Sequence, residues 1–221
     1  MHACISLALG REYLNPDWPS EIARGYQLVE RFYNISIVGG DTNYISGPSV
    51  ISIAVTGKLL GSHPITRSGA KPNDHLFITG PIGGSLKKDR HMSPPNKLKT
   101  LESILAETEV TSMIDISDGF SSEIYHLASS SNVGFEIEKE SIPLHPDAAS
   151  FDSAICDGED FELLFTASKD FDEILSSKEK GDLEGITRIG KVTEHSLNVI
   201  LKEKSKKSIL HRGGFEHKQG G

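Results

Sequence analysis

Short apolar runs alternate along this chain with stretches of helical periodicity, a pattern that predicts a mixture of strands and helices. Apolar side chains recur at helical spacing over residues 20–33 and predict an amphipathic helix. β-branched runs predict strands at residues 35–38 and 50–60. The same patterns predict further strands at 76–79, 112–116, 134–138, 161–165, 186–192 and 198–202, and helices at 98–107, from 119 onward, and at 171–177.

These elements predict an α/β (α+β) chain organised in two domains. The run Gly61-Ser62-His63-Pro64 is typical of a junction, so we expect the domains to cover residues 1–60 and 61–221. Helices gathered on one side of a mixed sheet fit the second domain better than strict βαβ repetition. The second domain is long enough to fold alone, whereas the first is not expected to.

One segment joins an apolar strand to a helix and carries two carboxylates. It reads Met113-Ile114-Asp115-Ile116-Ser117-Asp118-Gly119-Phe120. The strand places Asp115 and Ser117 on one face, and Asp118-Gly119 makes the turn. Helix N-termini attract phosphate, and carboxylates at the same point would repel it unless a divalent cation stood between them. The segment therefore indicates Mg²⁺-nucleotide chemistry; the alternative is that Asp and Ser simply cap the helix.

A second candidate lies at the end of the strand predicted over residues 35–38. Gly39 and Gly40 would let the backbone turn sharply and approach a ligand, presenting Asp41 beside the Thr42 hydroxyl. The alternative is an ordinary turn that joins two strands.

The third candidate is an acidic segment against an apolar run, with Asp157, Glu159, Asp160 and Glu162 close together. A strand through residues 161–165 would place Asp160 and Glu162 on one face. Acids at this density repel one another unless they are solvated, hydrogen-bonded or bound to cations. Composition favours cations, because residues 115–173 hold fifteen Asp and Glu against two Lys, although a solvated acidic loop stays open as the alternative.

The remaining composition narrows the class of partner. A formal net charge of −8 argues against nucleic acid. Apolar runs stay short of the roughly twenty residues that a membrane-spanning helix needs. No Gly-x-x-x-x-Gly-Lys-Ser/Thr sequence is present, which excludes an ordinary P-loop kinase. Cys4 and Cys156 show neither disulfide nor zinc spacing, which indicates free thiols in a reducing cytoplasm.

The motifs, taken in order, resemble those of the thiamine-monophosphate kinase family, which shares a superfamily with aminoimidazole ribonucleotide synthase and selenophosphate synthetase. The resemblance covers nearly the whole chain and rests on Gly-Gly-Asp-Thr (39–42), Ile-Thr-Arg-Ser-Gly-Ala-Lys-Pro-Asn-Asp (65–74), Asp-Ile-Ser-Asp-Gly (115–119), Asp-Gly-Glu-Asp-Phe-Glu-Leu (157–163) and Gly-Gly-Phe-Glu-His (213–217). It implies the mixed-sheet, two-domain fold of aminoimidazole ribonucleotide synthase. Complete members carry a long N-terminal stretch with further aspartates, so the resemblance also implies an incomplete first domain here.

The resemblance further implies transfer of the ATP γ-phosphoryl group to thiamine phosphate, giving thiamine diphosphate, with several Mg²⁺ ions. No catalytic side chain is implied, since phosphoryl transfer depends on positioning and on cations. Two other interpretations stay open: another ATP-using synthetase of the superfamily, or a truncated, non-catalytic chain that binds ligand or dimerises. A homodimer is expected through the first domain, were that domain complete.

Individual roles also follow from the resemblance. An arginine offers a planar fork of donors to phosphate oxygens, and an aromatic face suits a cationic thiazolium ring. Magnesium would be bound by Asp41, Asp115 and Asp118, ATP would contact Gly40, Asp41, Arg67 and Ser117, and thiamine phosphate would contact Glu159 and Phe215.

Overall fold

A computed structural model describes residues 2–11, 15, 17–177, 181–194 and 196–215. The chain divides into two compact units, Met1–Ser62 and His63–Gly221, close to the junction expected from the sequence. Each unit combines helix and sheet, so the predicted mixed α+β class is confirmed. The ATP and magnesium role given to the first domain stays a prediction.

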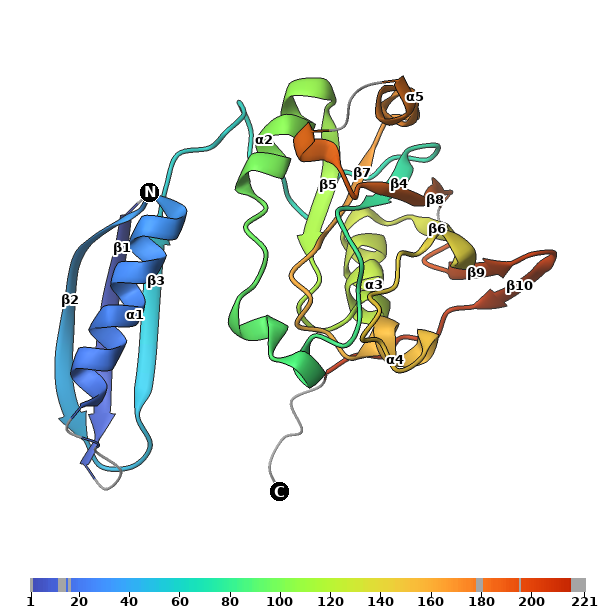
Figure 1. The fold of residues 1–221 in the computed structure, drawn as a ribbon. Coiled ribbons are helices and arrows are strands. Elements are labelled where there is room, and N and C mark those ends of the chain that lie inside the picture. Colours follow the sequence, from blue (N-terminus) through green and yellow to red (C-terminus); the bar gives the residue numbers. More distant parts are fainter. Residues whose placement is uncertain (1, 12–14, 16, 178–180, 195, 216–221) are drawn as a thin grey trace. The chain divides into compact units, whose positions relative to one another are not determined.

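The first unit is a three-stranded sheet with one helix along a face (Figure 1). The central strand β1 pairs in parallel with β2 and antiparallel with β3. β1, a strand of nine residues, was not predicted. The elements are β1 (His2–Gly10), α1 (Trp18–Tyr33), β2 (Ser36–Ile45) and β3 (Val50–Thr56).

The predicted turn at Gly39-Gly40 is wrong, because β2 continues through both glycines and through Asp41. Gly40 lies opposite Ile5 in the register of β1 and β2. A Cβ added at Gly40 would lie 1.9 Å from the Ile5 carbonyl oxygen, so glycine is required there by the close approach of two strands. The next strand, β3, ends at Thr56 rather than at residue 60.

The second unit is built on a seven-stranded mixed sheet with the order β10-β9-β6-β8-β4-β7-β5. Its neighbouring strands pair antiparallel except β6 and β9, which are parallel. Neither α4 nor β10 was predicted. The strands are β4 (His75–Ile78), β5 (Val110–Asp115), β6 (Gly134–Glu138), β7 (Leu163–Ala167), β8 (Thr187–Thr193), β9 (Val199–Glu203) and β10 (Lys206–Ile209), and the α-helices are α2 (Leu98–Glu107), α3 (Phe120–Ser131), α4 (Phe151–Cys156) and α5 (Asp170–Ser177).

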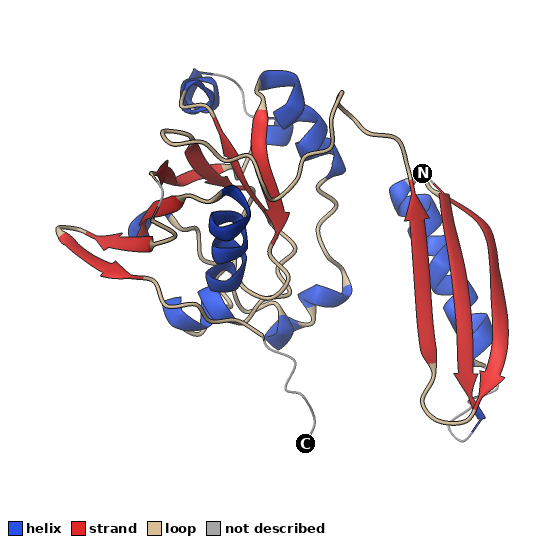
Figure 2. Cartoon of the chain, turned by 180° about the vertical axis from the view of Figure 1, so that it is seen from behind, coloured by secondary structure: helices blue, strands red, loops and turns tan. Residues whose placement is uncertain are grey.

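Helices cover both faces of this sheet, which corrects the expectation that they gather on one side. Side chains alternate across each strand, so Leu76 and Ile78 pack in one cluster with α3, whereas Phe77 faces the other way. On that second face Phe165 and Phe171 meet Phe77, with ring centroids 5.3 and 5.2 Å from it. Seen from behind, α3 lies in front of the sheet (Figure 2).

Helix ends follow local sequence. Asn34 and Asn132 take left-handed conformations immediately after α1 and α3, with φ of 51° and 54°, and their N–H groups bond back to the preceding turn. Over the described ranges of the chain, no helix combines the length and apolar character that crossing a membrane requires.

The contrast between Gly39 and Gly40 gives a test of this strand register. Gly40→Ala is expected to lower the free energy of unfolding of the first unit by about 1–3 kcal/mol, because the new methyl group meets the β1 backbone. Gly39→Ala is the matched control, since the nearest atom to its Cβ, Cys4 Sγ, is 3.8 Å away. Hydrogen exchange of β1 amides with increasing denaturant measures both; equal effects would contradict the register.

Candidate functional site

The turn between β5 and α3 presents two carboxylates to solvent. Asp115 ends β5 and is exposed, Ile116 is fully buried, and Asp118 is exposed again just before the helix. Gly119 caps α3 with a φ of 109°, and a Cβ there would come within 2.8 Å of the Cys156 carbonyl oxygen. The predicted strand, turn and helix are thus present, and the alternation that places Asp115 outward buries its neighbour.

The acidic segment pairs with this turn through its backbone. The N–H groups of Glu159 and Phe161 donate to the carbonyl oxygens of Ser117 and Ile116 at 2.7 and 2.9 Å. Glu159 and Phe161 both have positive φ, 59° and 53°, which non-glycine residues adopt only when their surroundings impose it. These bonds hold Glu159, half-buried, next to the turn that carries the two aspartates.

The C-terminal segment reaches the same turn. Phe215 N–H donates to the Asp118 carbonyl oxygen at 2.9 Å, and the Phe215 side chain is 60% exposed. Gly214 precedes it with a φ of 117°, and a Cβ at Gly214 would lie 2.4 Å from the same carbonyl oxygen. The structure therefore brings Ser117, Asp118, Glu159 and Phe215 together. The predicted motif also includes Glu216 and His217, which lie outside the described residues.

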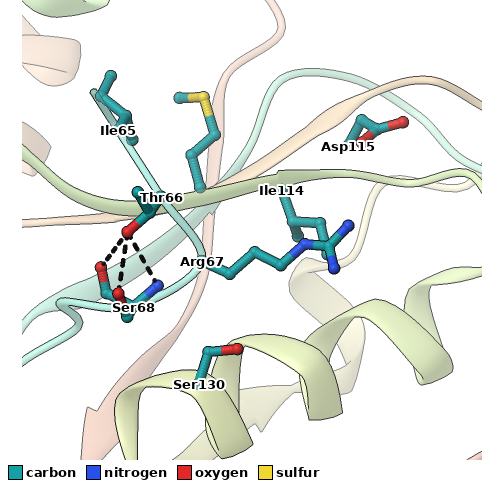
Figure 3. A pocket seen from close by; sticks show the side chains of 8 residues that line it. Ile65, Thr66, Arg67, Ser68, Ile114, Asp115 and Ser130 are labelled. Atoms are coloured by element: carbon teal, nitrogen blue, oxygen red, sulfur yellow. Dashed lines mark hydrogen bonds between the residues drawn. The ribbon is translucent and has the colours of Figure 1, made fainter.

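Arg67 lies along the edge of β5 that does not pair with β7, in a cavity of about 660 Å³ that Asp115 also lines. Figure 3 shows its side chain extending through this cavity, between β5 and the helix that carries Ser130. The segment is fixed by backbone and hydroxyl contacts: Met113 N–H donates to the Thr66 carbonyl oxygen, and Ser131 Oγ donates to the Arg67 carbonyl oxygen at 3.1 Å. Arginine and aspartate therefore line one cavity.

The same Ser131 hydroxyl oxygen accepts hydrogen bonds from the N–H groups of Gly69 and Ala70, both at 3.2 Å. One side chain at the C-terminal end of α3 thus holds the loop that carries Arg67. Sequence reasoning did not identify Ser131, because nothing in its neighbourhood marks a contact with a loop more than sixty residues earlier.

Glu123 was also missed, although it lies at the base of the turn. Its side chain is buried, and Oε1 accepts from the Asp118 N–H at 3.2 Å and from the Ser117 hydroxyl at 3.4 Å. Burial raises the pKa of Glu123, while the hydrogen bond from Asp118 acts against this. Glu123 lies four residues after the Gly119 cap, not the three of a capping box, so the local sequence did not mark it.

Two of the four acids in the acidic segment are structural rather than solvated. The predicted strand over residues 161–165 is wrong at its start, because β7 begins at Leu163 and the residues before it form a bent connection. Asp160 and Glu162 are 4% and 6% exposed. Thr79 Oγ1 donates to Glu162 Oε2 at 2.5 Å, and Lys97 Nζ lies 2.6 Å from the same oxygen. These two acids are therefore hydrogen-bonded and paired with residues of this chain.

Asp160 fixes the loop that follows β4. Both its carboxylate oxygens accept from the Gly83 N–H at 3.0 Å, and Arg90 Nη2 lies 3.2 Å from Oδ1. Burial raises the pKa of Asp160 from 3.8 to about 6, although Gly83 and Arg90 oppose the rise. The stretch around Arg90 contains two short 3-10 helices, and the arginine itself is only partly exposed.

Asp41 belongs to the first unit and is exposed on β2. Its carboxylate accepts from Thr42 N–H and Asn43 Nδ2, at 2.9 and 2.5 Å. Within the described part of each unit, no group of three or more His, Cys, Asp or Glu side chains could hold a metal ion. The three-aspartate magnesium set is thus not assembled by either unit alone.

The carboxylates of Asp115 and Asp118 still suit a hard cation. Both are exposed, and neither accepts a hydrogen bond or forms an ion pair with another residue that the structure describes. Oxygen donors with free lone pairs are the ligands that Mg²⁺ prefers, and two such groups leave positions for phosphate oxygens and water. The donor set therefore fits magnesium with a nucleotide phosphate.

Comparisons with known proteins agree with this geometry. A family model described as "AIR synthase related protein, C-terminal domain" matches residues 54–202. A thiamine-monophosphate kinase from Rhodopirellula baltica is 34% identical over 86% of this chain and 61% of its own length. One from Pyrococcus horikoshii is 32% identical over 90% of this chain and 67% of its own. The chain thus spans 61–74% of the curated relatives it matches.

Solved structures share the fold. The crystal structure of thiamine monophosphate kinase from Aquifex aeolicus aligns with a TM-score of 0.70 and 25% identity, covering 94% of this chain and 74% of that one. The hydrogenase maturation protein HypE aligns with a TM-score of 0.78 at 15% identity, covering 99% of this chain and 78% of that one, which shows the fold alone.

The fold and the matched domain place this chain among the AIR synthase related proteins. Within that class the chain belongs to the thiamine-monophosphate kinase family, as its motifs predicted.

Asp160 gives a pH-dependent prediction for stability. Because its folded pKa lies above the unfolded value, the folded state binds the proton more tightly, and stability is lost as pH rises through about 6. Relative to Asp160→Asn, the unfolding free energy of the unaltered chain is expected to fall by about 2 kcal/mol between pH 4 and pH 7. Urea titrations at each pH measure the difference, with exposed Asp182→Asn as control. A pH-independent difference would contradict the assignment.

Proposed function

We propose that this chain catalyses the ATP-dependent phosphorylation of thiamine phosphate, giving thiamine diphosphate and ADP. The convergence of the Asp115–Gly119 turn with Glu159 and Phe215 carries the proposal, because backbone hydrogen bonds join three segments distant in sequence at this turn. Support also comes from a ThiL structure solved with AMPPCP and TMP, which has the same fold. The relatives named as thiamine-monophosphate kinases agree with this reaction.

We assign nucleotide binding to residues on both sides of β5. Arg67 offers a permanently charged, planar set of N–H donors to phosphate oxygens, in the cavity that Asp115 lines. The Ser117 hydroxyl, whose hydrogen is donated to Glu123, offers its oxygen as an acceptor at the turn. Gly40 and Asp41 of the first unit are assigned to the same nucleotide by the family motif, and this assignment stays a proposal.

Asp115 and Asp118 would hold magnesium, with Asp41 as a third ligand. Bound there, magnesium would neutralise charge on the phosphates and allow two anions to approach each other. The protein's own contribution is the placement of these carboxylates on a turn fixed by backbone hydrogen bonds, which leaves their oxygens free.

Glu159 and Phe215 are assigned to thiamine phosphate. An aromatic face attracts a cationic thiazolium ring, and Phe215 is exposed enough to offer one. Glu159 is held beside it by the bond from its N–H to the Ser117 carbonyl oxygen, and its negative charge complements the same cation. The two residues therefore suit a positively charged aromatic ring.

The chemistry needs no general base. The acceptor is a phosphate oxygen of thiamine phosphate, largely ionised near neutral pH. It forms a bond to the γ-phosphorus of ATP while the bond from that phosphorus to the ADP oxygen breaks. This chain's residues then serve to bind and align two anions. We place the reaction in the cytoplasm, in accord with the free thiols of Cys4 and Cys156.

We also propose that two copies associate through the first unit. In the described residues of this unit, β2 and β3 are the edges of the sheet, so the outer side of each strand can meet a second copy. On β3, Ile51, Ile53 and Val55 lie on one face and are 50, 55 and 58% exposed, whereas Val50 on the opposite face is 53% exposed. An apolar stripe of this kind on an edge strand is typical of an interface.

Activity tests the proposal directly. The chain, given ATP, thiamine phosphate and Mg²⁺, is expected to form thiamine diphosphate, measured by chromatography, and to lose this activity with EDTA. Asp115→Asn and Asp118→Asn are each expected to lower kcat/KM by about a hundredfold or more, because each removes a charged magnesium ligand. Asp182→Asn, an exposed acid of the second unit, should leave the rate unchanged. No product from the unaltered chain would refute the proposal.

Association has its own measurement. Sedimentation equilibrium is expected to give twice the monomer mass of 24.1 kDa. Ile53→Lys should shift the chain to monomer, because it puts a charge into the apolar stripe. Ile209→Lys is the matched control, since Ile209 is 53% exposed on β10, an edge strand of the other unit. A monomer from the unaltered chain, or a dimer that survives Ile53→Lys, would contradict this interface.

A further inference from the structure

We propose that Glu123 is a positioning residue for the magnesium-nucleotide site, acting through the Ser117-Asp118 turn; this rests on the proposed function. Glu123 is 3% exposed and therefore reaches no ligand itself. Its Oε1 accepts hydrogen bonds from Asp118 N–H at 3.2 Å and from Ser117 Oγ at 3.4 Å. Its effect on ligand must pass through these two residues.

The other bonds to this turn come from main-chain groups. Glu159 N–H donates to the Ser117 carbonyl oxygen, and Phe215 N–H donates to the Asp118 carbonyl oxygen. These fix where the carbonyls point, but neither reaches the Ser117 hydroxyl or the Asp118 N–H. Among the described residues, Glu123 supplies the side-chain acceptor that engages both groups. It thereby sets the Ser117 rotamer and the peptide plane from which the Asp118 side chain projects.

The location of Glu123 explains why a buried acid is tolerated there. Glu123 follows the Gly119 cap in the first turn of α3, where acidic side chains interact favourably with free N–H groups of the helix. The cost of burying a carboxylate beside Asp115 and Asp118 is nevertheless real, since burial and these neighbours raise its pKa. A cap alone could be made by Ser or Asn from the preceding turn; only a longer side chain reaches back to Asp118 while Asp118 stays free for ligand.

The test compares three variants with the unaltered chain. Glu123→Met keeps the volume of the side chain and removes the acceptor. Glu123→Asp shortens the side chain by one methylene, which moves the carboxylate away from Asp118. Glu123→Gln keeps an acceptor oxygen in its place. Binding of Mg²⁺ with AMPPCP, measured by calorimetry, is expected to weaken at least about tenfold in Glu123→Met and in Glu123→Asp, and to be largely restored in Glu123→Gln. Glu173→Met, at an exposed first-turn position of α5, is the matched control and should bind normally.

A second readout does not depend on ligand. Hydrogen exchange of the Asp118 amide in the free protein is expected to quicken in Glu123→Met, while amides of the β7 core stay protected. If Glu123→Met does not fold, Glu123→Asp carries the comparison. Normal binding and normal Asp118 protection in a folded variant that lacks the acceptor would overturn the positioning role.

The outcomes also separate this role from the proposed function. If the unaltered chain binds Mg²⁺ with AMPPCP but forms no thiamine diphosphate, the proposed reaction fails and the positioning role is still decided by the variants. If the unaltered chain binds no magnesium nucleotide, both are overturned.

Discussion

Three backbone hydrogen bonds continue the pairing of β5 and β7 beyond the ends of both strands. The N–H of Ile116 donates to the Glu162 carbonyl oxygen at 2.8 Å, and the N–H groups of Phe161 and Glu159 donate back to the turn. Without this pairing, the segment that carries Glu159 would be an acidic loop free to leave the turn. Because the pairing uses main-chain groups only, it fixes the position of the site while leaving exposed side chains available for ligand.

The same pairing divides the acidic segment into two kinds of residue. Asp160 and Glu162 point into the protein, where Gly83, Arg90 and Lys97 satisfy them. Glu159 stays beside the turn and is half-buried. Repulsion between these acids is therefore relieved in two ways. The buried acids pair with cationic side chains of this chain, and the outer ones face solvent or ligand.

The sequence predicted the parts of the site that depend on local pattern. The strand that ends at Asp115, the glycine turn and the helix that follows could each be read from period-two and period-3.6 spacing. The family motif supplied Arg67, which no spacing argument links to β5. The turn expected at Gly40 was wrong because the need for glycine there comes from a neighbouring strand, β1, whose position the local pattern does not contain. Glu123 was missed, and the partners of Asp160 were not foreseen, for the same reason: burial is decided by packing between distant segments, and a carboxylate in the sequence does not reveal its partner.

The helix α3 joins two anchors that belong to different parts of the site. Glu123 in its first turn holds the Asp118 turn, and Ser131 at its last residue holds the loop of Arg67. An α-helix of twelve residues is about 18 Å long and resists compression, so it acts as a rigid spacer between the two. The distance between the Asp118 turn and the Arg67 loop is therefore set by the number of residues in α3. A single inserted residue would rotate one anchor by about 100° relative to the other, although every site residue would still be present.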